Sequence, residues 1–201
     1  MDQQTQQENR EREWVRRLFE QKGIAPLDVR SLKCPAPDVG VALSDGRFLA
    51  IEVTEVLAGE HARRTARKKD VQSAQQAAGG IGLMFTQPAN ALDVACRIEA
   101  KVGKDYQVPH GHQLHLLLAA GTVEHGSLAS ALPSILSISE LDQLTHDMLS
   151  RSRYQHAYLH VQLGQGLYEW NRHQRWHEIH PPHPVEAHYP DASEPVRQAA
   201  R

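Results

Sequence analysis

Residues 37–55 read P-D-V-G-V-A-L-S-D-G-R-F-L-A-I-E-V-T-E and predict a β-hairpin with one acidic residue on each strand. Side chains along a strand alternate between two faces. On both sides of the S-D-G segment, apolar residues occupy every second position. This pattern constrains the fold strongly, because it predicts an antiparallel strand pair and also the face that each strand buries.

The length of the turn decides whether the two acids, Asp38 and Glu52, lie side by side. A two-residue Asp45-Gly46 loop would place them on opposite faces. A three-residue loop over 44–46 pairs position 38 with position 52 and aligns both apolar faces. Such loops favour a glycine in the left-handed conformation at their end, and Gly46 stands there. We therefore expect the three-residue loop and two neighbouring carboxylates.

Neighbouring carboxylates are unfavourable, because like charges repel and each raises the pKa of the other. A divalent cation between them removes this penalty. The hairpin therefore predicts a Mg²⁺ or Mn²⁺ site, and such a site points to phosphodiester chemistry. The alternative is an ordinary surface hairpin with two solvated acids, since short motifs often occur by chance.

A helix predicted over about 8–21 adds a third acid. Its apolar stripe consists of Trp14, Val15, Leu18 and Phe19. On a helical wheel, Glu11 falls near the middle of this stripe. A carboxylate on a buried face usually has a partner, but an acid near a helix N-terminus also suits the helix dipole. Both interpretations stay open, and the first gains weight because the helix leads directly into the hairpin.

The remaining pattern predicts a mixed β-sheet flanked by helices, in the α/β or α+β class. Further helices are predicted over about 60–78, 88–102 and 137–151, and further strands near 27–34, 81–86, 113–120, 154–163 and 167–170. We expect one domain over 1–171. A tail over 172–201, rich in His and Pro, shows no apolar periodicity.

Composition excludes several classes of protein. The formal net charge is −2, so any nucleic-acid-binding surface must be a local patch. No apolar run is long enough to cross a membrane, and the first ten residues do not resemble a signal peptide. The two cysteines, Cys34 and Cys96, argue against a disulfide framework. We therefore expect a cytoplasmic protein without a membrane partner.

The segments E-R-E-W-V-R-R-L-F-E-Q-K-G, P-D with its hairpin, and I-E-V-T resemble the PD-(D/E)XK nuclease superfamily, which has the restriction-endonuclease-like fold. The core is similar to that of archaeal Holliday-junction resolvases, and the resemblance covers residues 11–54. It implies Mg²⁺-dependent hydrolysis of DNA by water. It also implies that Glu11, Asp38 and Glu52 hold the metal, with the main-chain carbonyl of Val53 as a further ligand.

The sequence departs from the family at Thr54, where the family has a lysine. A lysine there positions the attacking water and stabilises negative charge that develops on the phosphate. Loss of such stabilisation typically lowers the rate by about 10²- to 10³-fold. Either another cation replaces the lysine or the site is degenerate. Some members of the superfamily carry the lysine on the following helix.

The segment H-A-R-R-T-A-R-K-K-D over 61–70 supplies candidate cations. Lys68 is the predicted replacement lysine, and Gln75 is a second polar group expected near the metal. A helix with small residues on one side and cations on the other can lie along a phosphate backbone. The simpler alternative is a solvated basic helix face. The predicted contacts with nucleic acid are Arg63, Arg64, Arg67, Lys68, Lys69 and Gln75.

Together these features predict a metal-dependent endonuclease acting on DNA. The predicted catalytic residues are Asp38, Glu52, Thr54 and Lys68. The alternative is a catalytically degenerate protein of the same fold that binds nucleic acid or protein. A third possibility is a homodimer formed by pairing of strands.

Overall fold

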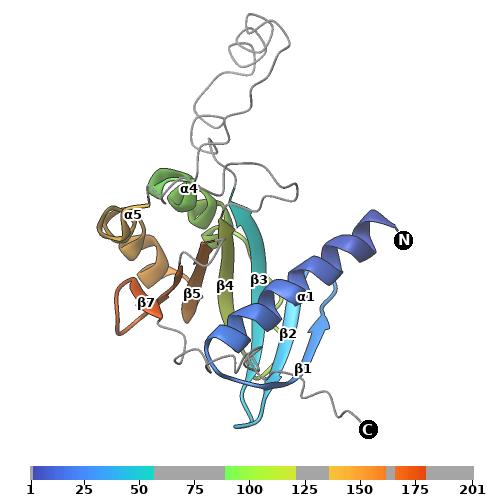
Figure 1. Ribbon diagram of the computed structural model, residues 1–201. Helices are drawn as coiled ribbons and strands as arrows, with labels where there is room; N and C mark the ends of the chain where they lie inside the picture. Colours follow the sequence, from blue (N-terminus) through green and yellow to red (C-terminus); the bar gives the residue numbers. More distant parts are fainter. Residues whose placement is uncertain (1, 57–88, 121–135, 162–165, 180–201) are drawn as a thin grey trace, which may run out of the picture.

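The computed structural model describes residues 2–56, 89–120, 136–161 and 166–179. The described chain forms a seven-stranded mixed sheet with helices on both faces (Figure 1). This arrangement confirms the predicted α/β class. In chain order the elements are α1 (Gln3–Gln21), β1 (Pro26–Ser31), β2 (Val39–Leu43), β3 (Phe48–Val56), α4 (Ala91–Val102), β4 (His112–Ala120), α5 (Ile138–Arg151), β5 (His156–Val161), β6 (Gly166–Asn171) and β7 (His177–Ile179).

The strands lie in the sheet in the same order as in the chain. The central pairs β3–β4 and β4–β5 are parallel, and the pairs on either side are antiparallel. Parallel neighbours require a crossover connection, which α5 supplies between β4 and β5. Helix α1 covers one face of the sheet, while α4 and α5 cover the other (Figure 1). Two separate hydrophobic cores result, one on each face.

The β2–β3 hairpin has the predicted three-residue loop. Val39 lies opposite Ile51, and the Leu43 N–H donates to the Arg47 carbonyl at 2.9 Å. Gly46 ends the loop with φ +83°, in the left-handed region that glycine tolerates best. Continued by one residue, this register brings position 38 opposite position 52.

The two faces of β3 differ in character. Leu49, Ile51 and Val53 pack into the core beneath α1. Glu52 and Thr54 point to the opposite face, where α4 and α5 pack, and both are buried. The alternation predicted from the sequence is therefore correct.

The helices also follow their capping signals. Asn90 and Asp93 form a reciprocal capping box at the start of α4, and Ser137 accepts a hydrogen bond from the Glu140 N–H at the start of α5. Helix α1 begins five residues earlier than predicted, because the Asp2 side chain caps it.

The sheet continues past the predicted boundary at residue 171. Strand β7 pairs with β6, and Trp176 just before it is buried, with its indole N–H donating to Thr145 Oγ1 at 2.9 Å. Residues 172–179 are therefore part of the folded domain and not of a tail. A three-residue strand has too few positions to show periodicity, so the sequence pattern did not indicate it.

Two predicted elements, the helix over 60–78 and the strand over 81–86, lie outside the described residues, as does the tail from residue 180. None of the helices that the structure describes is long and apolar enough to cross a membrane.

Candidate active site

Glu52 lies on the central strand β3 and is only 3 % exposed. Its side chain faces α4, on the same side of the sheet as its β4 neighbour Leu116. A buried carboxylate requires a partner. That partner is Lys101 near the end of α4, whose Nζ lies 2.5 Å from Glu52 Oε1.

Asp38 stands immediately before β2, and its Oδ2 accepts a hydrogen bond from the Val53 N–H at 2.8 Å. In the hairpin register, the Val53 N–H would meet the main chain of residue 37 if the ladder continued. Strand β2 begins only at Val39, so the Asp38 carboxylate takes the place of the missing carbonyl. The hydrogen bond therefore holds Asp38 beside Glu52.

Electrostatics connects these residues with Glu11 of α1. Burial, followed by the charge of Glu52, raises the pKa of Asp38 to about 7. Burial also raises the pKa of Glu11; a hydrogen bond from Gln7 opposes this, and the charge of Glu52 adds to it. We call Glu11, Asp38, Glu52 and Lys101 the acid cluster. Within the part of the chain that the structure describes, Lys101 is the lysine whose charge acts on all three carboxyl groups.

Sequence reasoning missed Lys101, although the signal was present. Val94 and Ile98 are fully buried on α4, and Lys101 lies seven residues after Val94. Positions separated by four and seven residues share a helix face. The helical wheel that singled out Glu11 on α1 would have singled out Lys101 on α4.

Two tyrosines adjoin the Glu52–Lys101 pair. Burial, followed by interaction with Glu52, raises the pKa of Tyr106 well above its ordinary value. Burial and the charge of Glu52 also raise the pKa of Tyr154, whose hydroxyl donates to the Lys101 carbonyl at 3.5 Å. Both tyrosines therefore stay neutral at physiological pH. The sequence pattern did not identify either.

The structure thus brings together the predicted residues Glu11, Asp38 and Glu52, with the Val53 main chain bound to Asp38. Thr54 lies two residues beyond Glu52 on the same face and is 5 % exposed. The other predicted site residues lie outside the described residues, namely Arg63, Arg64, Arg67, Lys68, Lys69 and Gln75.

Within residues 2–56, 89–120, 136–161 and 166–179, no group of three or more His, Cys, Asp or Glu side chains is arranged to hold a metal ion. Mg²⁺, however, usually binds through one or two carboxylates together with water and substrate phosphates. Asp38 and Glu52 are such a pair, and burial, followed by the charge of Glu52, raises the pKa of Asp38. The donor chemistry fits a hard divalent cation.

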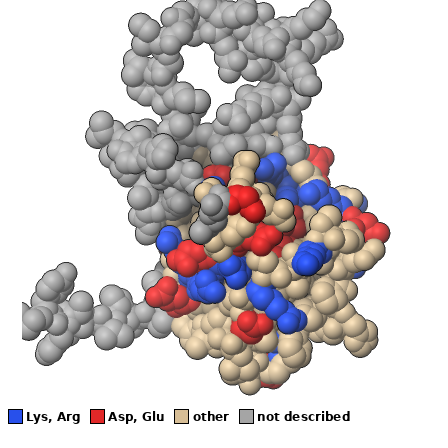
Figure 2. Space-filling model, turned by 90° about the vertical axis from the view of Figure 1, so that its right-hand side faces the viewer, with Lys and Arg blue, Asp and Glu red and all other residues tan. Residues whose placement is uncertain are grey.

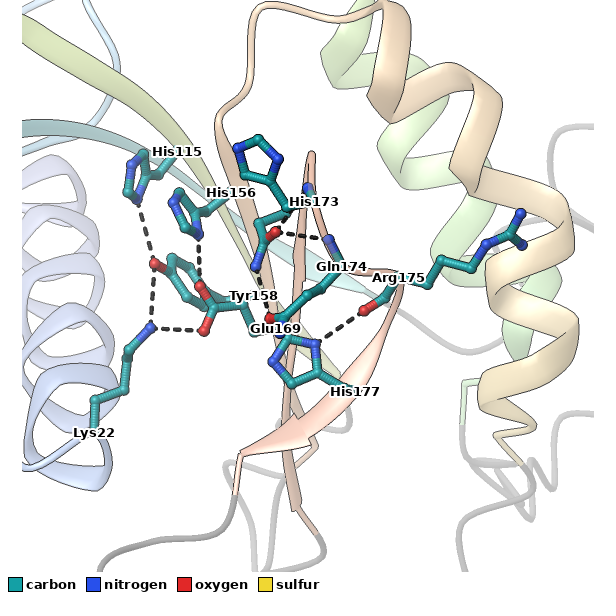
Figure 3. Close-up of polar contacts among 10 residues, drawn as sticks. Lys22, His115, His156, Tyr158, Glu169, His173, Gln174, Arg175 and His177 are labelled. Atoms are coloured by element: carbon teal, nitrogen blue, oxygen red, sulfur yellow. Dashed lines mark hydrogen bonds and ion pairs between the residues drawn. The ribbon is translucent and has the colours of Figure 1, made fainter.

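A second buried cluster lies on the α1 face of the sheet (Figure 3). Glu169 of β6 accepts hydrogen bonds from Lys22 Nζ at 2.8 Å and from His156 Nδ1 at 2.6 Å. Burial alone would raise the pKa of Glu169, but these two partners outweigh burial and lower it to about 2. The carboxylate is therefore fully charged and fully paired.

Lys22 also lies 3.5 Å from the hydroxyl of Tyr158, which is 3.4 Å from His115 Nδ1. His115 is 2 % exposed, and burial together with the nearby His156 and Lys22 lowers its pKa to about 3. It is therefore neutral. Its buried Nε2 has no hydrogen-bond partner among the described residues. We call Lys22, His115, His156, Tyr158 and Glu169 the histidine network; no local pattern in the sequence indicates it.

Charged side chains of both signs are interspersed on the surface seen in Figure 2. That face therefore shows no extended patch of a single sign. Comparison with protein-family models, with curated proteins and with solved structures found no match to this chain. A functional assignment therefore rests on the chemistry of the site.

Proposed function

We propose that this protein is a metal-dependent endonuclease that hydrolyses phosphodiester bonds in DNA. The observation that carries the proposal is the Glu52–Lys101 pair beside Asp38 and Glu11. Among the described residues, it places the ammonium group of Lys101 near three carboxyl groups. Lys101 can supply the positive charge that Thr54 cannot, and it comes from a helix that follows the hairpin in the chain.

Each residue of the acid cluster has a distinct role in this proposal. Asp38 and Glu52 would hold a Mg²⁺ or Mn²⁺ ion, with Glu11 adding negative charge nearby and the Val53 carbonyl as a further candidate ligand. When bound, such a metal lowers the pKa of a coordinated water and neutralises a phosphate. Thr54 offers a hydroxyl on the same face as Glu52.

Lys101 then takes the role of the missing family lysine. In the structure its ammonium group neutralises Glu52. With a cation held by Glu52, the same ammonium group would be available to orient the attacking water and to stabilise negative charge on the phosphate. The basic segment over 63–69, outside the described residues, remains the predicted contact with the DNA backbone.

The first test is cleavage of supercoiled plasmid with Mg²⁺ or Mn²⁺, using the wild type and the Glu52→Gln, Asp38→Asn and Lys101→Met variants. We expect nicking that requires the metal and falls by about 10²- to 10³-fold in each variant, because each loses part of the charge arrangement. Lys104→Met is the matched control, since Lys104 is exposed and lies three residues beyond Lys101. It should cleave like the wild type.

Titration with Mn²⁺, followed by calorimetry, separates loss of metal binding from loss of catalysis. Asp38→Asn should weaken Mn²⁺ binding, whereas Lys101→Met should retain it. Plasmid that stays intact with either metal, or nicking that survives all three substitutions, would contradict the proposal.

Because Glu52 is already paired with Lys101, the structure also fits a second candidate function. In this second case the protein keeps the fold, lacks catalytic activity and binds nucleic acid or protein. In that case the lysine would neutralise Glu52 permanently. Mn²⁺ would then fail to bind, and the wild type would bind DNA without cleaving it.

A further inference from the structure

Strand β1 forms one edge of the sheet as far as the described residues extend, and it pairs there with β2 alone. The Leu32 N–H donates to the Asp38 carbonyl at 2.8 Å, so residue 32 directs its main chain toward β2. Main-chain groups in an antiparallel ladder alternate in direction along the strand. The N–H and C=O groups of Val29 and Ser31 therefore point away from β2, toward the open edge.

Several features restrict what can pair with this edge. Pro26 has no N–H to donate, and the register shifts between Pro26 and Asp28. Asp28 and Arg30 are exposed and lie 3.9 Å apart on the face turned away from Val29. Prolines, bulges and charges of this kind protect natural sheet edges against unspecific association. They leave the segment 28–31 as the part of the edge that can accept a strand.

The charges then select one register for a second copy of the same strand. Antiparallel pairing through outward-pointing residues permits three main alignments. Placing Leu27 opposite Val29 brings Asp28 against Asp28, and placing Val29 opposite Ser31 brings Arg30 against Arg30. Placing Val29 opposite Val29 brings Asp28 against Arg30, twice across the two-fold axis. Opposite charges at facing positions stabilise a strand pair, whereas like charges destabilise it.

We propose that β1 pairs antiparallel with β1 of a second copy, with Val29 opposite Val29, and so joins the two sheets into one. The interface is isologous, as a two-fold dimer requires. Its main-chain hydrogen bonds come from Val29 and Ser31, and its specificity comes from the two Asp28–Arg30 pairs. Figure 2 views the side of the molecule on which β1 lies, where charges of both signs are accessible.

The apolar side of β1 fits the same occupant. Leu27 is 73 % exposed, so its side chain is accessible to a second copy. Together with Val29 and Ile24 it lines a cavity of about 680 Å³ between α1 and β1. In the proposed register, Val29 and Ser31 of the second copy reach this side of the strand. Part of the exposed surface of Leu27 is then covered.

Charge reversal in the full chain tests the interface. We expect the wild type to be a dimer in sedimentation velocity experiments over a range of concentrations. Asp28→Arg and Arg30→Asp should each weaken dimerisation by about 10- to 100-fold, because both facing pairs become repulsive. The double variant Asp28→Arg/Arg30→Asp should restore the dimer. Circular dichroism confirms that these exposed substitutions leave the fold intact.

Cysteine cross-linking tests the register in a Cys34→Ser background. Facing residues of a non-hydrogen-bonded strand pair are close enough for a disulfide. An equimolar mixture of the Asp28→Cys and Arg30→Cys variants retains one Asp28–Arg30 pair in the mixed dimer, and on oxidation it should form a linked dimer with a 28–30 linkage in mass spectrometry. Asp28→Cys alone should not form one, nor should Arg30→Cys alone.

A wild type that stays monomeric at every concentration would overturn the proposal, as would a dimer that the reversed charges do not weaken. A 28–28 or 30–30 linkage would overturn the register. None of these measurements depends on cleavage or on metal, so their outcome is distinct from the test of the proposed function.

Discussion

The Glu52–Lys101 pair of the acid cluster and the histidine network lie on opposite faces of one sheet, and the two clusters show opposite electrostatic behaviour. In the histidine network, a single carboxylate has two partners, and the pKa of Glu169 falls to about 2. In the acid cluster, the described residues place three carboxyl groups around Lys101, and burial, followed by the charge of Glu52, raises the pKa of Asp38 to about 7. The first arrangement stabilises the fold by itself. In the second, burial and the charge of Glu52 raise the pKa of a carboxyl group, a perturbation that is common at functional sites.

Replacing the lysine of the acid cluster should have the largest effect on stability, and replacing that of the histidine network the next largest. Lys101→Met leaves Glu52 buried without its partner, so we expect the free energy of unfolding to fall by about 3–5 kcal/mol. Chemical denaturation without metal measures this loss. Mn²⁺ should restore part of it, because a bound cation replaces the lost charge.

Lys22→Met is the matching change in the histidine network. Glu169 keeps its hydrogen bond from His156, so the expected loss is smaller, about 2–3 kcal/mol. Mn²⁺ should have no effect on this variant. If Mn²⁺ restored the stability of both variants equally, or of neither, the proposed difference between the two clusters would be wrong.

Asp38→Asn should stabilise the metal-free protein. The unfolded Asp38 loses its proton near its ordinary pKa of 3.8, while the folded one keeps it until about pH 7. The wild type therefore loses stability as the pH rises between these values, by about 4 kcal/mol at most. Asparagine has no charge and can still accept the Val53 hydrogen bond. We expect a gain of about 2 kcal/mol at pH 8 in denaturant titrations, shrinking to zero below the unfolded pKa.

A gain that persists at low pH would show that packing, and not charge, is responsible. The same variant should lose the stabilisation by Mn²⁺ that the wild type shows. Stability gained together with binding lost is the pattern expected at a functional site.

His115→Leu should have the smallest effect, confined to mild acid. The pKa of His115 is lowered from 6.5 to about 3, so the unfolded state takes up a proton first as the pH falls. The wild type therefore loses about 1 kcal/mol between pH 7 and pH 5.5 at this position. In thermal or denaturant unfolding, the free energy of unfolding of the variant should fall between pH 7 and pH 5.5 by about 1 kcal/mol less than that of the wild type. Equal losses would show that His115 does not contribute to acid sensitivity.

The sequence predicted those parts of the fold that depend on neighbours in the chain. The β2–β3 hairpin follows from alternation and from Gly46, and the starts of α4 and α5 follow from Asn90 and Ser137. The buried position of Glu11 follows from its place on the helical wheel. In each case, residues within a few positions of one another determine the outcome.

The parts that were missed depend on contacts between distant residues. The histidine network combines α1, β4, β5 and β6, and no local pattern connects them. Strand β7 forms because β6 offers an edge and Trp176 fills a space beside α5. The helical-wheel pattern that indicates a buried Glu11 also indicates Lys101. The basic segment over 61–70 is, however, a more conspicuous group of cations in the sequence.

The separation of the site residues along the chain also has a consequence for folding. Asp38 and Glu52 meet as soon as the hairpin closes, whereas Lys101 follows Glu52 by 49 residues and arrives only with α4. Short-range contacts generally form before long-range ones. The two carboxylates therefore face each other for a time without their lysine, and repulsion between them disfavours the hairpin at neutral pH. Under the metal binding proposed above, a divalent cation would relieve that repulsion while this part of the chain folds.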